Sequence, residues 1–181
     1  MSIYLRNFVR YLILVAIQVL LLNKLSLRWW ASPGVIPAFV PFIYPLFILL
    51  MPLSTPIGFM LIASFLMGLS IDAFMDTGGM HAAACVLMAY LRMNILTTLL
   101  PRKVSDYGMI TPSPKNMGWG IFLTYAALLL LFHHLFYFII EIWTFRSIGF
   151  MLMKVLVTLI TSMIFVILYS LLFSSAIVKS D

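Results

Sequence analysis

The chain has 181 residues, of which 64% are hydrophobic and only 9% are charged. An ordinary soluble domain has about 45–50% apolar and about 25% charged residues, so this composition excludes a soluble globular protein. A membrane-spanning helix needs about 20 mostly apolar residues, which leaves room for about six such helices. We therefore expect one membrane domain, residues 1–181, with no soluble domain attached.

The net charge is +6, from 11 Lys and Arg residues against 5 Asp and Glu residues. The basic residues are scattered near the ends of apolar segments, which suits contact with lipid headgroups. Because no basic run interleaved with aromatic residues is present, nucleic acid is not an expected partner. The single cysteine, Cys85, lies in an apolar stretch and cannot form a disulfide within the chain.

Six apolar segments follow one another along the chain. The first resembles a signal peptide, but no small-residue cleavage site follows it, so we expect it to remain as a span. The predicted spans are Tyr4–Leu22, a span within 33–56, Pro56–Asp72, Gly79–Leu100, Trp119–Ile140 and Phe150–Phe173. The fold class expected is an all-α integral membrane protein with six transmembrane helices.

The distribution of basic residues favours a cytoplasmic location for both termini. In this orientation the inner side carries Arg6, Arg10, Arg102, Lys103, Lys115 and Lys179, and the outer side carries Lys24, Arg28, Arg146 and Lys154. The polar segment 101–118 then becomes a cytoplasmic loop. The tryptophans fall near predicted span ends, as an interfacial aromatic belt requires: Trp29, Trp30, Trp119 and Trp143.

Prolines recur at every fourth residue of the second segment, at Pro33, Pro37, Pro41 and Pro45. Each proline lacks an N–H donor and clashes with the preceding turn, so we expect irregular backbone and regular helix only from about Pro41 onward. Irregular backbone survives at membrane depth only where protein or a water-filled cavity covers it, so this segment should be short and packed among its neighbours. A loop followed by a short helix and a functional broken helix both remain open.

The stretch MGLSIDAFMDTGGMHAAA, residues 67–84, predicts a tight hairpin between the third and fourth spans. Four residues at intervals of four share one helix face: Ser64, Gly68, Asp72 and Asp76. Ser64 and Gly68 form a small-residue stripe that lets another helix approach closely. Gly78 and Gly79 break the helix, and small residues such as Ala82 begin the next one.

Asp72, Asp76 and His81 are expected to rim the outer mouth of this hairpin. Asp76 or Thr77 can cap the N-terminus of the fourth span, where a carboxylate also meets the positive end of the helix. We favour this structural role over a ligand or ion site, because ionisable residues are tolerated at helix ends. A metal site needs more ligands than this spacing guarantees, and a proton relay is a weaker alternative.

The stretch GLSIDAFMDTGGMHAAACVLMAYLR resembles the signature of MreD, the rod-shape-determining membrane protein of bacteria. The matching residues, at the family's spacing, are Gly68, Asp72, Gly79, His81 and Ala82. DTGGMHAAA, together with the later LTYAALLLLFHHLFYFIIE, is similar in particular to MreD of the Bacteroidetes group. The short chain and the proline-bearing second span also agree with this family.

The resemblance implies a non-enzymatic protein of the bacterial inner membrane, without catalytic residues, metal or cofactor. It implies a role in the cell-elongation machinery that builds side-wall peptidoglycan and sets cell shape. The partners implied are MreC, the actin-like MreB and the RodA–transpeptidase pair, besides membrane lipids. The fold implied is similar to the substrate-binding S component of ECF vitamin transporters.

A second polar group lies in the fifth span. His134, Tyr137 and Glu141 share a helix face, and His133 precedes them. The spacing does not match a zinc motif of the HExxH type. We favour a His–Glu hydrogen bond at the membrane interface over a metal site.

Arg92 lies within the fourth span, and we expect it to snorkel toward the inner headgroups. A buried pairing with a partner protein is the alternative. No nucleophile–base pair and no Gly-rich phosphate loop stand out, so catalysis is not expected. The leading hypothesis is a membrane scaffold of the elongation complex; the alternative is an S component of an ECF-type transporter, and an intramembrane enzyme ranks last.

Overall fold

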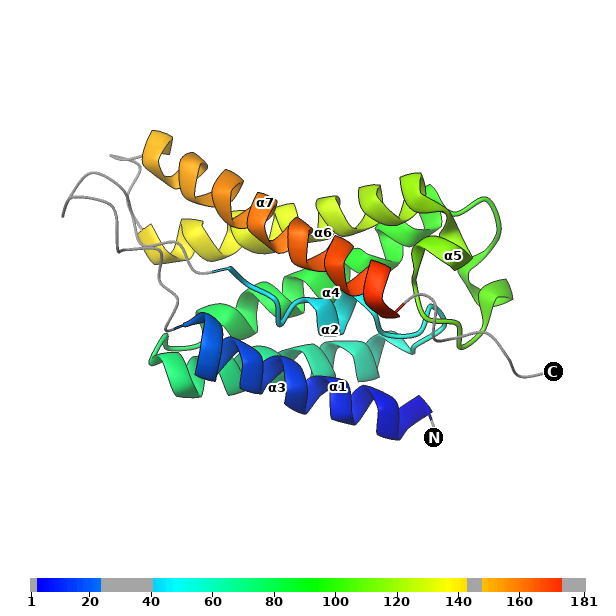
Figure 1. Cartoon of the computed structure of the whole chain (residues 1–181), viewed down its shortest axis with the longest axis horizontal. Coiled ribbons are helices and arrows are strands. Elements are labelled where there is room, and N and C mark those ends of the chain that lie inside the picture. Colours follow the sequence, from blue (N-terminus) through cyan, green and yellow to red (C-terminus); the bar gives the residue numbers. More distant parts are fainter. Residues whose placement is uncertain (1–2, 24–40, 143–147, 174–181) are drawn as a thin grey trace.

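The computed structural model describes residues 3–23, 41–142 and 148–173 (Figure 1). Within these ranges the chain is helical, without strands, and five apolar helical stretches are long enough to cross a membrane. The helices are α1 (Ile3–Ile17), extended by η1 (Gln18–Leu22), α3 (Ile57–Met75), α4 (Met80–Leu99), α6 (Trp119–Ile142) and α7 (Ile148–Phe173). The 19 residues of α3 reach about 28 Å, close to the ~30 Å hydrocarbon thickness of a bilayer. The chain is an all-α, multi-pass membrane protein.

The long helices form a bundle in which α3 pairs with α4, α4 with α6, and α6 with α7. Figure 1 shows that α1 begins and α7 ends at one end of this bundle. The connection between α4 and α6 lies at the same end and contains η2 (Val104–Tyr107) and α5 (Pro114–Met117). The turn between α3 and α4 lies at the opposite end.

The central segment, residues 41–56, runs through the middle of the bundle between these two ends (Figure 1). The expectation of regular helix from about Pro41 onward is wrong, because the only helix here is α2 (Leu46–Leu49). Pro45 is the N-cap of this helix, where its missing N–H costs nothing, and Pro52 follows the end of the helix. The expectation of a short, irregular segment packed among its neighbours is confirmed, since residues 41–53 are all buried.

The surrounding helices satisfy the backbone of this segment at its start. The Gln18 side chain donates from Nε2 to the Pro41 carbonyl (3.1 Å) and accepts from the Ile43 amide at Oε1 (2.9 Å). Ser162 of α7 donates to the Phe42 carbonyl at 2.9 Å. Buried backbone without such partners would be costly, so these two side chains make non-helical chain possible at membrane depth.

Several expectations concern residues outside the described ranges: Trp29, Trp30, Trp143, Pro33, Pro37, Lys24, Arg28, Arg146 and Lys179. Trp119 is described; it begins α6 and is exposed, as expected for a residue near a span end.

Candidate functional site

The α3–α4 hairpin is closed by backbone contact at Gly68. A Cβ atom added there would overlap the backbone of Ala82 and the carbonyl of His81. Ser64, one turn earlier on α3, is fully buried. The small-residue stripe therefore lies where the two helices touch, as its spacing predicts.

Asp72 caps the N-terminus of α4 from the end of α3. Its Oδ1 accepts from the His81 amide (3.0 Å) and from the Thr77 hydroxyl, and its Oδ2 accepts from the Ala82 amide (2.8 Å). The expectation that Asp76 or Thr77 would cap α4 is therefore wrong. So is the expectation that Asp72 would lie on a hydrated rim, because the side chain is only 5% exposed. The first turn of α4 folds over the carboxylate and covers it.

Asp76 and Gly79 shape the turn between the two helices. Asp76 is exposed, as a rim residue should be, and ends α3 in the left-handed conformation with φ 55°. Aspartate tolerates this conformation better than most residues with a side chain. Gly79 begins α4 with φ 93°, which glycine adopts at little cost.

His81 lies inside the bundle, so the expectation that it would rim the hairpin mouth is wrong. It is fully buried, and its ring stacks on Tyr137 of α6 with the centroids 4.4 Å apart. Its Nδ1 lies 2.6 Å from the hydroxyl of Tyr44, in the central segment. Helix α6 and the central segment cover the ring on the side that a two-helix hairpin would leave open.

Tyr44 joins His81 to a second histidine. Its hydroxyl also lies 3.0 Å from Nε2 of His133, which is fully buried on α6. His134 lies close by, with Nε2 3.4 Å from the Ser162 hydroxyl. All 3 histidines of the chain thus converge on the start of the central segment, around the ring of Phe42.

Glu141 does not join this group. It forms an ion pair with Lys154 of α7, with 2.6 Å between Oε2 and Nζ. The expected His–Glu hydrogen bond is therefore wrong: His134 turns toward α7 and the central segment, while Glu141, two turns later, meets a cation near the end of the bundle.

The Tyr44 hydroxyl carries one proton, so it donates to at most one of the two imidazoles and accepts from the other. His81 and His133 must therefore present complementary ring nitrogens, one as acceptor and one as N–H donor. Among the described residues no three His, Cys, Asp or Glu side chains are grouped closely enough to hold a metal ion. What the contacts form is a hydrogen-bonded network that fixes the central segment between α4 and α6.

Arg92 fixes the other half of the central segment. Its guanidinium donates to the carbonyls of Met51 and Pro52 (3.2 Å to Pro52) and to the Tyr125 hydroxyl (2.8 Å). Tyr125 in turn donates to the Leu49 carbonyl at 3.1 Å. Arg92 is only 2% exposed, so the expectation that it would snorkel to the headgroups is wrong. Its partners lie in its own chain: two carbonyls that follow α2 and the Tyr125 hydroxyl of α6.

Four residues that hold the central segment were not singled out from the sequence: Gln18, Tyr44, Tyr125 and Ser162. Gln18 is a polar residue inside an otherwise apolar span, and such residues commonly face a bundle interior. That signal could have identified it. Tyr44 and Tyr125 carry no comparable signal, because tyrosines are common at membrane interfaces as well as inside bundles.

One face of the hairpin is hollowed by a groove of about 720 Å³ between α3 and α4. It is lined by Leu61, Phe65, Leu69, Gly79, Ala82, Ala83, Val86, Leu87 and Tyr90. Its small residues are Gly79, which caps the start of α4, and Ala82 and Ala83 in the first turn of α4. Tyr90 stands at the surface and is 60% exposed. The groove is apolar, as a surface in contact with lipid or with another transmembrane helix should be.

Comparisons of the chain with protein-family models, with curated proteins and with solved structures find no match.

Proposed function

We propose that the chain is a non-enzymatic scaffold of the bacterial cell-elongation complex, similar in role to MreD, and that it holds a partner's transmembrane helix in the α3–α4 groove. The observation that carries this proposal is the groove itself, which is lined by the small residues Ala82 and Ala83 and by the exposed Tyr90. Helices associate in lipid through close packing at small residues, because lipid offers no hydrophobic driving force between them.

The polar residues of the hairpin support a scaffold because their contacts hold the helices together. Asp72 caps α4, and Gly68 permits the backbone contact that fixes the position of Ala82. A rigid hairpin presents its outer groove in one geometry, which lowers the entropic cost of binding a partner helix. The partners proposed from the MreD resemblance are MreC and RodA within the membrane and MreB in the cytoplasm.

An S component of an ECF-type transporter is the alternative function, and the packing of the bundle weighs against it. Substrate capture needs a pocket that can close around a small molecule. The middle of the bundle is instead filled by the central segment, whose Tyr44, Ile48 and Leu49 are fully buried. In either function the segment 41–56 would serve as the sixth crossing, in place of a regular helix.

The orientation proposed places the α3–α4 turn outside and both termini in the cytoplasm of the inner membrane. Basic residues at the end of the bundle where α1 begins support it, since such residues favour the cytoplasmic side. The described ones are Arg6, Arg10, Arg102, Lys103 and Lys115.

Depletion in the bacterium that encodes the chain tests the function. The scaffold proposal predicts rounded cells, loss of side-wall incorporation of a fluorescent peptidoglycan precursor, and co-purification of MreC and RodA in mild detergent. Ala83→Leu, which fills the groove, should reduce co-purification, whereas Ala73→Leu, at an exposed α3 residue outside the groove, should not. Normal cell shape together with co-purified transporter ATPases would favour the alternative function.

A further inference from the structure

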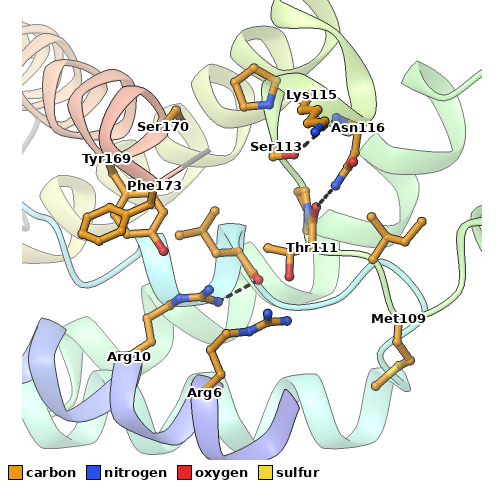
Figure 2. Close-up of a pocket in the computed structure, with 14 residues that line it drawn as sticks. Arg6, Arg10, Met109, Thr111, Ser113, Lys115, Asn116, Tyr169, Ser170 and Phe173 are labelled. Carbon is orange, nitrogen blue, oxygen red and sulfur yellow. Dashed lines mark hydrogen bonds between the residues drawn. The ribbon is translucent and has the colours of Figure 1, made fainter. Parts of the chain in front are cut away.

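A second cavity, of about 300 Å³, is shown in Figure 2. It lies where α1 begins and α7 ends, at the end of the bundle opposite the α3–α4 turn (Figure 1). Arg6 and Arg10 reach it from α1, and Tyr169 and Phe173 border it from the end of α7. The connection before α6 closes the remaining side with residues 109–116. Because transmembrane helices begin and end here, the cavity lies at one surface of the membrane.

The lining of this cavity carries positive charge without a balancing carboxylate. Arg6, Arg10 and Lys115 line it, and no Asp or Glu is among the lining residues of the described chain. The one ion pair within the described ranges, Lys154 with Glu141, involves none of these three cations. Three cations around one small cavity repel one another, and an anion between them would relieve that repulsion.

Two polar atoms at this cavity lack a partner. The Arg6 Nε and the Thr111 Oγ1 are buried, and neither has a hydrogen-bond partner within the described part of the chain. Arg10 is held in place, since its Nη1 donates to the Leu50 carbonyl and to the Asn7 side chain, both at 3.0 Å. Arg6 therefore offers a buried N–H donor, and Thr111 a hydroxyl, beside a cation whose position is fixed.

We infer that this cavity binds a phosphate group, and that its source is the headgroup of an anionic phospholipid. Guanidinium groups bind phosphate oxygens through paired N–H donors, and a hydroxyl supplies a further donor. A volume of about 300 Å³ lies at the small end of the range for ligand pockets, which suits a single headgroup. Basic pockets between transmembrane helices are known headgroup sites, and Tyr169 and Phe173 offer apolar surface beside this one.

This site is independent of the scaffold function, because it lies at the other end of the bundle from the α3–α4 turn. Thermal unfolding of the purified full chain in a neutral detergent tests it. Dioleoyl phosphatidylglycerol should raise the Tm by about 5 °C at saturation, and the zwitterionic phosphatidylcholine should have a much smaller effect. Arg6→Gln and Thr111→Val should each remove at least about half of that shift.

Lys103→Gln is the matched control, since it removes one positive charge from an exposed residue of the same connection that does not line the cavity. It should keep the full shift. Thr111→Val preserves side-chain volume, so it gives a result even where Arg6→Gln does not fold. Equal loss of the Tm shift in Thr111→Val and Lys103→Gln, or no Tm shift of the unmodified chain with either phosphatidylglycerol or inorganic phosphate, would overturn the site.

The phosphate group could come from a lipid headgroup or from free phosphate. Inorganic phosphate, compared with chloride at equal ionic strength, distinguishes these two sources. A shift with phosphatidylglycerol that depends on Thr111 and Arg6, without one from inorganic phosphate, supports a lipid headgroup. The same dependence with inorganic phosphate alone, and no effect of lipid, would keep the phosphate site but overturn its assignment to lipid.

Discussion

The Oδ2 atom of Asp72, near the end of α3, lies 2.8 Å from the backbone nitrogen of Ala82, in the first turn of α4. A carboxylate from one helix thus caps the next, and it does so beside the contact between Gly68 and Ala82. This pairing fixes the angle and the depth at which the two helices meet, because the cap and the backbone contact must form together.

Asp72→Asn should destabilise the fold, although it preserves the shape of the side chain. Both carboxylate oxygens accept from backbone amides, so an amide side chain would place an N–H₂ group against an N–H donor. We expect a loss of about 1–3 kcal/mol, measured by thermal unfolding followed by tryptophan fluorescence. Asp76→Asn is the control and should be neutral, because asparagine also tolerates the left-handed conformation. Equal Tm values for the two variants would contradict the cap.

Gly68→Ala should destabilise the hairpin, since the added methyl group overlaps the backbone of α4. Overpacking of this kind costs about 1–3 kcal/mol, and here the obstacle is backbone that cannot rotate away. Gly58→Ala is a matched control on the same helix, because a Cβ atom there meets nothing within 4 Å. The Gly58 variant should keep its Tm or gain slightly, and a Gly68 variant that does likewise would show that the helices do not touch at this residue.

Tyr44→Phe should loosen the central segment from α4 and α6. The substitution removes the hydroxyl that contacts His81 and His133 and leaves two buried ring nitrogens without that partner. The expected loss is about 1–3 kcal/mol, against no measurable change for Tyr90→Phe at the exposed groove residue. Hydrogen exchange measured by mass spectrometry should show faster exchange across 41–53; unchanged exchange there would argue against the network.

Arg92→Lys should keep only part of the stability that the arginine gives to the fold. An ammonium group cannot serve the Tyr125 hydroxyl and the carbonyls after α2 with the planar geometry of guanidinium. We expect a loss of about 1.5–3 kcal/mol in thermal unfolding, because hydrogen bonds from charged groups are the strong ones. The exposed Arg102→Lys provides the comparison, and a similar Tm for both lysine variants would indicate that Arg92 makes no specific contact.

The sequence predicts local features of this fold well. Composition identifies the membrane class, and the helix bounds of α3 and α4 lie close to those expected from apolar runs and from Gly79. The spacing of Ser64 and Gly68 identifies the touching face, because a periodicity of four residues is a property of the helix alone.

What the sequence does not reveal depends on contacts between distant segments. Arg92 has a snorkelling route to the headgroups, and only the fold brings the carbonyls of the central segment to it. His81 lies at a helix start, where exposure is the ordinary expectation, but Tyr44 and Tyr137 cover it from elsewhere in the chain. Non-local burial of this kind leaves no periodic signal in the sequence.

Site-specific photo-cross-linking from the α3–α4 groove tests the scaffold proposal most directly. A photoreactive phenylalanine analogue replaces Tyr90, at the groove, or Phe132, a lipid-exposed residue of α6 that serves as the control. In cells that encode the chain, the proposal predicts an adduct with MreC or RodA from residue 90 and none from residue 132. Adducts with lipid alone at both residues, or the same protein adducts from both, would contradict a partner helix in the groove.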